Sequence, residues 1–229
     1  MEAREAIVNS TIYWLFRLLC RLDVKGMPRL PQSGPGVIIT NHTSNLEGPL
    51  LYVMMRPRPT IAMAKAELWS FFATRMLMEA WKAIPLHRGR LDRKAMERSW
   101  KTLDEGKFLC IAPEGKRSKD GTLLRALPGA TYFASERQVP IYPIVNWGCL
   151  GIGRELGHLR RPVVGLRVGY PFIVKKPEGG KWTGETRQAM ADEMMYQLAA
   201  LMPAELRGYY SDLSKSTTHY LDFQTPARA

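Results

Sequence analysis

The sequence has few of the residues that a disulfide framework, a metal centre or a nucleotide-binding loop requires. Its 229 residues include three cysteines, none of which is spaced as a C-x-x-C pair. The four histidines are far apart and form neither H-x-x-x-H nor H-E-x-x-H. No Walker sequence is present, and the glycine-rich stretch 148–153 does not fit the dinucleotide fingerprint. We therefore expect a protein of a reducing compartment that uses no metal and no bound cofactor.

Acidic residues are also scarce relative to basic ones. The chain has 33 Lys and Arg against 21 Asp and Glu, which gives a formal net charge of +12. Such a chain needs anionic partners, of which the candidates are a membrane surface, a phosphorylated substrate, an acidic carrier protein and nucleic acid. The basic residues are dispersed and show no nucleic-acid recognition signature, so we expect no nucleic-acid partner.

No hydrophobic run reaches the roughly 20 residues that a transmembrane helix needs, and no secretory signal is visible. Near the N-terminus, apolar residues recur at mostly helical spacing, at Ile7, Ile12, Trp14, Leu15, Leu18, Leu19 and Leu22. Side chains suited to lipid headgroups lie among them: Arg4, Tyr13, Trp14, Phe16, Arg17, Arg21 and Lys25. One interpretation is a helix packed on its own domain. We favour an amphipathic, membrane-associating helix over residues 1–25, at the cytoplasmic face of the cell membrane.

The remaining sequence alternates strand-like and helix-like segments. Strands are expected at 37–41, 60–64, 83–86, 107–111, 140–147 and 163–169. Helices are expected at 48–56, 68–81, 91–105, 128–137 and 184–201. This order predicts an α/β fold with a mixed, largely parallel sheet flanked by helices. The expected divisions are a linker at 26–36, a main domain at 37–202 and a C-terminal tail at 203–229.

His42 and Glu47 form the most informative pair. An apolar strand is predicted to end at His42, four residues separate the imidazole from the carboxylate, and Pro49 is predicted to open a helix. An imidazole titrates near neutral pH, so a carboxylate-oriented His42 can remove a proton from a hydroxyl. Ser44 and Glu47 also fit a helix capping box. Pro49 argues against that alternative, because it suits the first helical position, which leaves Glu47 just outside the helix.

Three further motifs follow in order. They are Ile84-Pro85-Leu86-His87-Arg88-Gly89, then Pro113-Glu114-Gly115-Lys116-Arg117-Ser118, and then Val139-Pro140-Ile141-Tyr142-Pro143. Together with Asn41-His42-Thr43-Ser44-Asn45-Leu46-Glu47, they resemble the glycerolipid acyltransferases of the 1-acylglycerol-3-phosphate acyltransferase type. The resemblance covers residues 37–145, nearly half of the chain.

The resemblance implies an O-acyltransferase of phospholipid biosynthesis. It would move a fatty acyl group from acyl-CoA or acyl-ACP to the sn-2 hydroxyl of lysophosphatidic acid, giving phosphatidic acid. His42 would be the base and Glu47 its orienting partner. Glu114 and Gly115 would help to bind the acceptor. Arg88 and Arg117 would hold its phosphate, because a planar guanidinium binds phosphate through two parallel hydrogen bonds.

The segment 68–81 is rich in aromatic residues and methionine. It can be an ordinary core helix, or its bulky face can line an acyl groove or touch lipid, since flexible methionines tolerate a mobile hydrocarbon. The candidate acyl-groove or membrane contacts are Trp69, Phe72, Met76 and Met78.

Two alternatives to this function remain. The family usually carries Asp at the position of Glu47 and an aromatic residue at that of Ala112, so the acceptor can instead be glycerol 3-phosphate or another lysolipid. A non-catalytic basic protein that binds membrane or nucleic acid is the second alternative.

Overall fold

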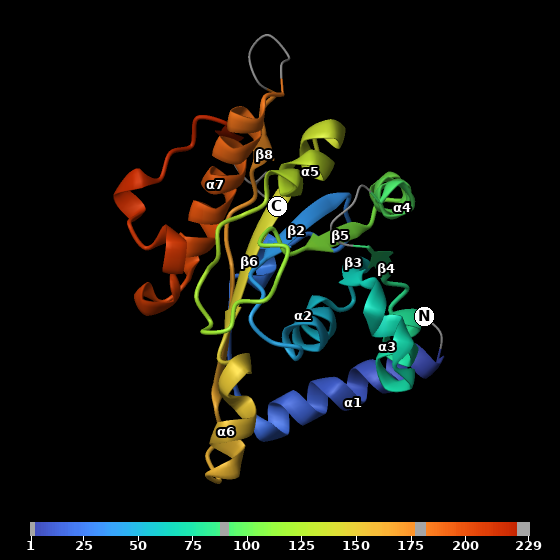
Figure 1. Ribbon diagram of the computed structural model, residues 1–229. Coiled ribbons are helices and arrows are strands. Elements are labelled where there is room, and N and C mark those ends of the chain that lie inside the picture. The colour runs from blue at the N-terminus through green and yellow to red at the C-terminus, as the bar shows by residue number, and fades with distance from the viewer. Residues whose placement is uncertain (1–2, 88–91, 177–181, 224–229) are drawn as a thin grey trace.

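The computed structural model describes residues 3–87, 92–176 and 182–223. Seven strands form one sheet in the order β1-β7-β6-β2-β5-β3-β4 (Figure 1). In chain order they are β1 Arg21–Lys25, β2 Gly36–Thr40, β3 Thr60–Lys65, β4 Ile84–Leu86, β5 Phe108–Ile111, β6 Ile141–Trp147 and β7 Val163–Val168. Two short strands, β8 Ile173–Val174 and β9 Leu221–Asp222, pair separately. The predicted mixed α/β architecture is confirmed.

The strand directions place several carboxyl ends at one edge of the sheet. β6 and β7 are antiparallel, whereas the other neighbouring pairs of the large sheet are parallel. The carboxyl ends of β2, β3, β4, β5 and β6 therefore lie together. The loops after parallel strands are the usual place for a ligand site in an open α/β sheet.

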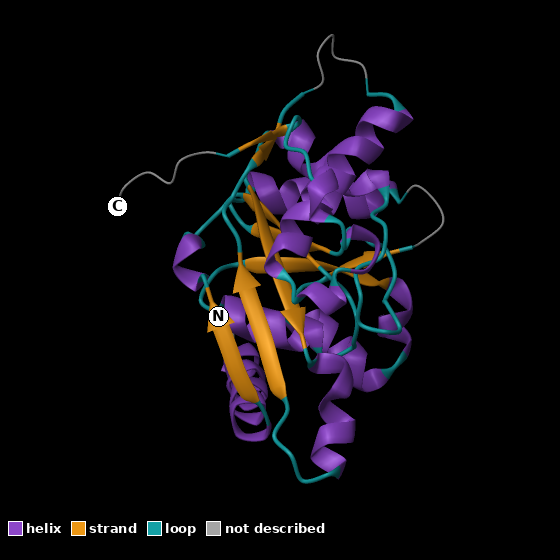
Figure 2. Ribbon diagram, turned by 90° about the vertical axis from the view of Figure 1, so that its left-hand side faces the viewer, coloured by secondary structure: helices purple, strands orange, loops and turns teal. Residues whose placement is uncertain are grey.

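Helices cover both faces of this sheet (Figures 1 and 2). Their bounds are α1 Ala3–Leu19, α2 Glu47–Met55, α3 Phe72–Ala80, α4 Arg93–Asp104, α5 Tyr132–Arg137, α6 Ile152–Gly157 and α7 Gly184–Leu201. Short 3-10 helices occur at Met27–Arg29, Ala66–Ser70, Pro128–Thr131, Cys149–Gly151, Ala204–Leu206, Gly208–Tyr210 and Leu213–Lys215.

The central strand β2 is buried on both faces, as expected for a strand covered by helices on each side. Val37 and Ile39 point into a cluster that contains Met194 and Leu198 of α7. Ile38 points the other way, into a cluster that contains Met55 of α2. The period-2 alternation of side chains along a strand explains this division.

The expectation of a helix over residues 1–25 is wrong at its C-terminal end. α1 ends at Leu19, and residues 21–25 form β1, which pairs with β7. Leu22 and Val24 lie on one face of this strand and pack against the buried clusters, so a period-2 pattern follows directly on a helical one. The segment after β1 also packs on the body, since Leu30 is buried and Arg58 donates to the carbonyls of Pro31 and Leu30.

α1 combines a packed face with an exposed apolar face. Phe16 and Cys20 are buried, and Trp81 donates from Nε1 to Oδ1 of Asn9 at 2.9 Å. The opposite face leaves large apolar side chains exposed: Ile7, Trp14, Leu15, Leu18 and Leu19. Within the described ranges, no helix has the length and apolar character needed to cross a membrane.

The segment predicted as one helix over 68–81 is divided into two. A 3-10 helix covers Ala66–Ser70, Phe71 is extended, and α3 begins at Phe72. Neither piece contains a fully buried residue, but Trp81, the last residue of the predicted helix, is buried and stacks on Tyr52 of α2. The C-terminal tail is held against α7. The buried carboxylate of Glu193 in α7 accepts hydrogen bonds from the backbone N–H groups of His219 and Tyr220 in the tail, directly before β9.

Candidate active site

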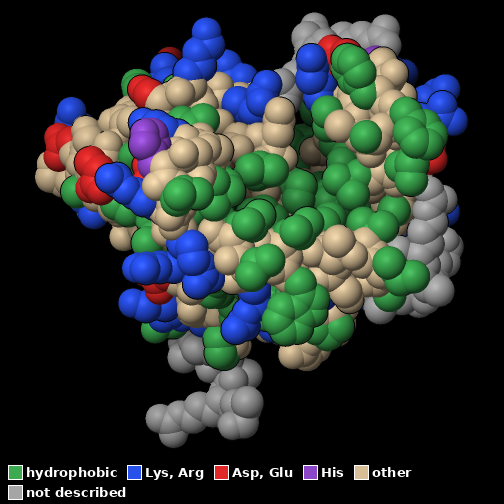
Figure 3. Space-filling model, turned by 90° about the horizontal axis from the view of Figure 1, so that it is seen from below, with side chains coloured by type: hydrophobic (Ala, Val, Ile, Leu, Met, Phe, Trp, Pro, Cys, Tyr) green, Lys and Arg blue, Asp and Glu red, His purple; other side chains and the backbone are tan. Residues whose placement is uncertain are grey.

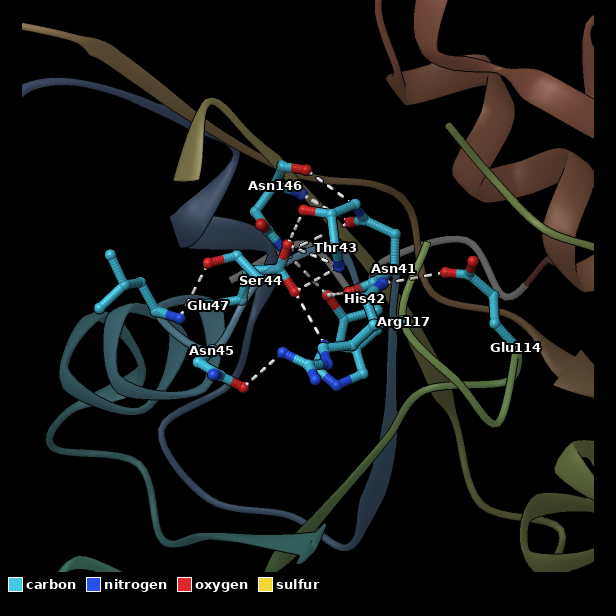
Figure 4. A network of polar contacts seen from close by, with 11 residues as sticks. Asn41, His42, Thr43, Ser44, Asn45, Glu47, Glu114, Arg117 and Asn146 are labelled. Atoms are coloured by element: carbon cyan, nitrogen blue, oxygen red, sulfur yellow. Dashed lines mark hydrogen bonds and ion pairs between the residues drawn. The ribbon is translucent and has the colours of Figure 1, made fainter. Parts of the chain in front are cut away.

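The loop between β2 and α2 brings His42 and Glu47 into contact, as Figure 4 shows. Nδ1 of His42 lies 3.0 Å from Oε2 of Glu47. A carboxylate can only accept, so the shared proton belongs on Nδ1, which leaves the lone pair of Nε2 free. His42 is 29% exposed and Glu47 only 4%. The imidazole therefore reaches the surface while its partner stays buried behind it.

Glu47 reaches His42 from inside the helix rather than from outside it. α2 begins at Glu47, so the expectation that Pro49 is the first helical residue is wrong. Pro49 is tolerated because the first-turn N–H groups have no intrahelical acceptor. The carboxylate accepts from the backbone N–H and the hydroxyl of Thr43. The capping box does not form: the Ser44 hydroxyl instead accepts from the Leu46 N–H at 3.1 Å.

The loop after β5 holds the backbone of His42 on both sides. The His42 N–H donates to Oε1 of Glu114 at 2.9 Å, and the His42 carbonyl accepts from the Ser118 N–H at 2.8 Å. Oε2 of Glu114 accepts from the Leu124 N–H at 2.9 Å. The backbone of His42 is thus fixed by a loop that lies about 70 residues further along the chain. A sequence cannot display these backbone contacts.

Glu114 is buried, with 2% of its surface exposed. Burial raises its pKa to about 7, against the opposing effect of the two backbone N–H donors, while the nearby Glu47 charge adds to the increase. Both carboxylate oxygens of Glu114 accept from the protein backbone, and its contact with an acceptor stays a prediction. Glu114 supports the site from behind.

Asn41 and Asn146 form a second support that the sequence reasoning missed. The Asn41 side chain donates from Nδ2 to the Asn146 carbonyl at 2.8 Å and accepts from the Asn146 N–H at 2.9 Å. This reciprocal pair joins the ends of β2 and β6 directly before His42. The sequence does show an asparagine near the end of each strand, but it does not show that β2 and β6 are neighbours in the sheet.

The residues expected to bind the acceptor differ in position. Arg117 is exposed, and its Nη1 donates to Oδ1 of Asn45 at 2.8 Å, which links the two loops that carry His42 and Glu114. Gly115 has a φ of +67°, in the left-handed region that glycine favours. Arg88 lies outside the described residues, directly after His87.

His87 forms a second histidine–carboxylate contact at the end of β4. Its Nδ1 lies 2.7 Å from Oδ2 of Asp92, whose Oδ1 accepts from the Ala95 N–H at the start of α4. The His87 backbone N–H, followed by its ring and the Ala95 N–H, lowers the pKa of Asp92. Asp92 therefore caps a helix and orients His87 next to the position of Arg88.

The candidate acyl-groove residues lie on the underside of the molecule with α1 and α3. Phe72 is exposed, whereas Trp69, Met76 and Met78 are partly buried. Figure 3 views this side, where hydrophobic side chains gather around a hollow. No cluster of three potential metal ligands occurs among the residues that the structure describes.

A family model described as Acyltransferase matches residues 21–147, more than half of the chain, and begins at the first residue of β1. The 1-acyl-sn-glycerol-3-phosphate acyltransferase alpha of Homo sapiens is 33% identical over 135 residues, which cover 55% of this chain and 45% of that protein. Taffazin of Dictyostelium discoideum is 31% identical over 123 residues, covering 48% and 43% respectively. The chain thus spans about half the length of the curated relatives it matches.

A solved structure shares the fold. The crystal structure of the 1-acyl-sn-glycerophosphate (LPA) acyltransferase PlsC from Thermotoga maritima aligns with a TM-score of 0.60 at 19% identity. The alignment covers 84% of this chain and 80% of that chain.

Proposed function

Because the chain belongs to the acyltransferase family, we propose that it moves a fatty acyl group from an acyl thioester to the sn-2 hydroxyl of lysophosphatidate. The single observation that carries this proposal is the contact between His42 and Glu47, with Nε2 of His42 left free at the surface. An oriented imidazole of this kind acts as a general base towards a hydroxyl.

In the proposed reaction, Nε2 of His42 takes the proton of the acceptor hydroxyl as its oxygen attacks the thioester carbonyl. The buried carboxylate of Glu47 stabilises the imidazolium that forms. A tetrahedral oxyanion results. It collapses by breaking the carbon–sulfur bond, and the departing thiolate receives the proton from His42. The products are the new ester and a free thiol.

The backbone amides nearest to His42 already have acceptors. The N–H groups of His42 and Thr43 donate to Glu114 and Glu47, and that of Ser118 donates to the His42 carbonyl. These three groups are therefore unsuited to stabilise the oxyanion. The exposed guanidinium of Arg117, which Figure 4 shows beside His42, is a cation that can carry that charge or the acceptor phosphate.

The favoured acceptor is a phosphorylated lysolipid. The second and third motifs contain Arg88 and Arg117, and a phosphate monoester accepts paired hydrogen bonds from guanidinium groups. The names of the human relative and the Thermotoga maritima structure support lysophosphatidate. Glycerol 3-phosphate and other lysolipids are the alternatives, because Glu47 replaces the usual Asp.

We also propose that the exposed face of α1 rests on the membrane surface. Figure 1 places α1 and α3 on the same side of the molecule, and Figure 3 shows hydrophobic side chains on this side with lysines and arginines around them. Phe71 and Phe72, at the start of α3, are exposed like the apolar side chains of α1. An apolar patch with a basic rim suits an anionic bilayer. Such a position would let an acceptor enter from the lipid while the helix still packs on its own domain.

An acceptor panel tests the function directly. Purified protein is incubated with acyl-CoA or acyl-ACP and, separately, lysophosphatidate, glycerol 3-phosphate or lysophosphatidylcholine, and the acylated products are measured. We expect transfer to lysophosphatidate that is lost in His42→Ala. Transfer to a different acceptor alone would replace the proposed substrate. Absence of transfer from either donor to any of them would contradict the enzymatic function.

A further inference from the structure

A cavity of about 880 Å³ lies beside the proposed active site and has no role in the function described so far. It is bounded by α6, the start of β7 and the loop at 120–121 that follows the third motif. Its wall also includes Thr43, the residue directly after the proposed base. The volume lies in the range of small-molecule sites. We call it the arginine cavity.

Four arginines line this cavity: Arg21, Arg154, Arg160 and Arg161. Two of them are committed to protein contacts. Arg161 donates to the carbonyls of Arg17 and Cys20 at the end of α1, and Nε of Arg154 lies 3.6 Å from Oε1 of Glu155. Arg21 and Arg160 are exposed and have no hydrogen-bonded or ionic partner for their guanidinium groups within the described part of the chain.

Two acidic side chains in the wall reduce, but do not cancel, this positive charge. Glu155 is next to Arg154. Asp120 accepts three hydrogen bonds from Ser118 and Thr122, and these lower its pKa to about 2, so its charge is directed into its own turn. Four arginines against two acids leave the cavity basic, with Arg21 and Arg160 available to an anion.

The rest of the wall is largely apolar. It includes Trp147, whose ring packs so closely over Gly165 that a β-carbon there would lie 2.1 Å from the ring. Leu150 and Leu206 also belong to the wall, and both lie next to Gly121. A ligand that suits this wall carries a phosphate group attached to a longer, partly apolar chain.

Acyl transfer requires two substrates to meet at His42. The exposed Arg117, with Asn45, lies on one side of the His42–Glu47 contact in Figure 4, and Thr43 lies on the other. The arginine cavity reaches the site at Thr43. A donor held in the arginine cavity would therefore lie against the residue that follows the proposed base in the sequence, away from Arg117.

We infer that the arginine cavity binds the phosphopantetheine arm of the acyl thioester, with its phosphate held by Arg21 and Arg160 and its thioester directed past Thr43. This inference rests on the proposed acyl transfer. The arm is common to CoA and to acyl carrier protein, so either can supply it. An anionic lipid headgroup shares the phosphate chemistry, but a site for lipid docking alone has no need to extend to Thr43.

The test uses Arg21→Glu and Arg160→Glu, each measured in two ways. Equilibrium binding of CoA by calorimetry needs no turnover, so it remains informative even if the proposed acceptor is wrong. We expect each substitution to weaken CoA binding about tenfold, because each removes a charge-assisted hydrogen bond and adds a repulsive charge. In steady-state assays, KM for the thioester should rise by a similar factor while KM for the acceptor is unchanged.

Arg98→Glu is the matched control. Arg98 is an exposed residue of α4 outside the cavity, and its replacement changes the net charge equally. It should leave CoA affinity unchanged. Equal effects of all three substitutions would overturn the inference, because general charge would then explain them.

Parallel binding measurements with acyl-ACP and with phosphatidylglycerol vesicles show which phosphate-bearing ligand the arginine cavity binds. Loss of affinity for both CoA and acyl-ACP supports recognition of the shared arm, and loss for CoA alone supports CoA as the donor. Weaker binding to vesicles with unchanged CoA affinity would overturn the inference in favour of a lipid site. If CoA binds with the predicted arginine dependence but no acceptor is acylated, the proposed function fails while the cavity assignment stands.

Discussion

Glu47 lies in the first turn of α2, yet its carboxylate reaches back to Nδ1 of His42 at a distance of 3.0 Å. The same carboxylate accepts from the Thr43 N–H, so one buried group fixes both the backbone after the imidazole and the ring itself. The longer side chain of glutamate suits this arrangement, because it must span the distance from the helix to the loop.

The first prediction concerns His42. Replacing it with alanine removes the proposed base, which typically contributes 10²–10⁴ in rate. We expect His42→Ala to lose at least about a hundredfold in kcat for acyl transfer, measured with saturating donor and acceptor. Its circular dichroism spectrum and unfolding midpoint should stay close to those of the parent protein, because the side chain is partly exposed. Near-parental turnover would refute the assignment.

The second prediction concerns Glu47. In Glu47→Gln, an amide of the same shape can still accept from Thr43, but it carries no charge to stabilise an imidazolium. We expect kcat to fall by roughly tenfold to a thousandfold while KM for the acceptor changes little. Initial rates over a range of acceptor concentrations would separate the two constants. An increase in KM alone would instead assign Glu47 to substrate binding.

The third prediction is a pH dependence of stability that arises from Glu114. Burial raises its pKa to about 7 in the folded protein, against 4.5 for an unperturbed glutamate. Between these values the folded state binds more protons than the unfolded state. Stability from this group is therefore complete below about pH 4.5 and is lost as the pH rises to about 7, by roughly 3 kcal/mol.

Urea unfolding of the parent protein and Glu114→Gln at several pH values checks this effect. We expect the decrease between pH 4.5 and 7 to be smaller in the variant by about that amount, since glutamine does not titrate. A parallel decrease in both proteins would contradict the prediction. In steady-state assays of Glu114→Gln, a reduced kcat with an unchanged KM for the acceptor would indicate that Glu114 positions His42 and does not contact substrate.

The fourth prediction concerns Gly115. A β-carbon at this position would lie 2.4 Å from Cδ1 of Leu127, but that leucine is exposed and can move. The positive φ of Gly115 cannot be relieved in this way. We expect Gly115→Ala to cost about 1 kcal/mol in unfolding free energy, with a similar cost in a Leu127→Ala background. Gly129→Ala, where a β-carbon meets no neighbour within 4 Å, is the control and should cost much less.

The fifth prediction concerns Leu159, which ends α6 in the left-handed region with a φ of +57° and is 97% exposed. The Arg160 N–H bonds to the Glu155 carbonyl and the Leu159 N–H to the Leu156 carbonyl, a helix end at which glycine is usual. An exposed leucine in a strained position suggests contact with something outside the domain.

We therefore expect Leu159→Gly to raise the unfolding free energy by about 1 kcal/mol and to weaken flotation with phosphatidylglycerol vesicles. Trp14→Glu, on the exposed face of α1, should weaken flotation without a gain in stability. Deleting residues 1–25 is a poorer test, because it also removes β1 from the sheet. Unchanged flotation in both variants would contradict membrane contact at these positions.

The sequence by itself determined the order of most strands and helices from β2 to α7, because period-2 and period-3.6 apolar patterns are local properties of the chain. The short elements α6 and β8 were not predicted. α7 has the predicted bounds, 184–201, and β2 differs from prediction by one residue at each end. The sequence also placed His42 and Glu47 within reach of each other, since a separation of five residues limits how far apart they can lie.

Only the tertiary structure decided what surrounds this pair. β2, β5 and β6 become neighbours through pairings between distant segments, so the contacts of His42 with Glu114 and of Asn41 with Asn146 have no local sequence signal. The same is true of β1, whose partner β7 lies more than 130 residues away. It is also true of the arginine cavity, because the pairing of β1 with β7 brings Arg21 close to the segment that precedes β7 and contains Arg160.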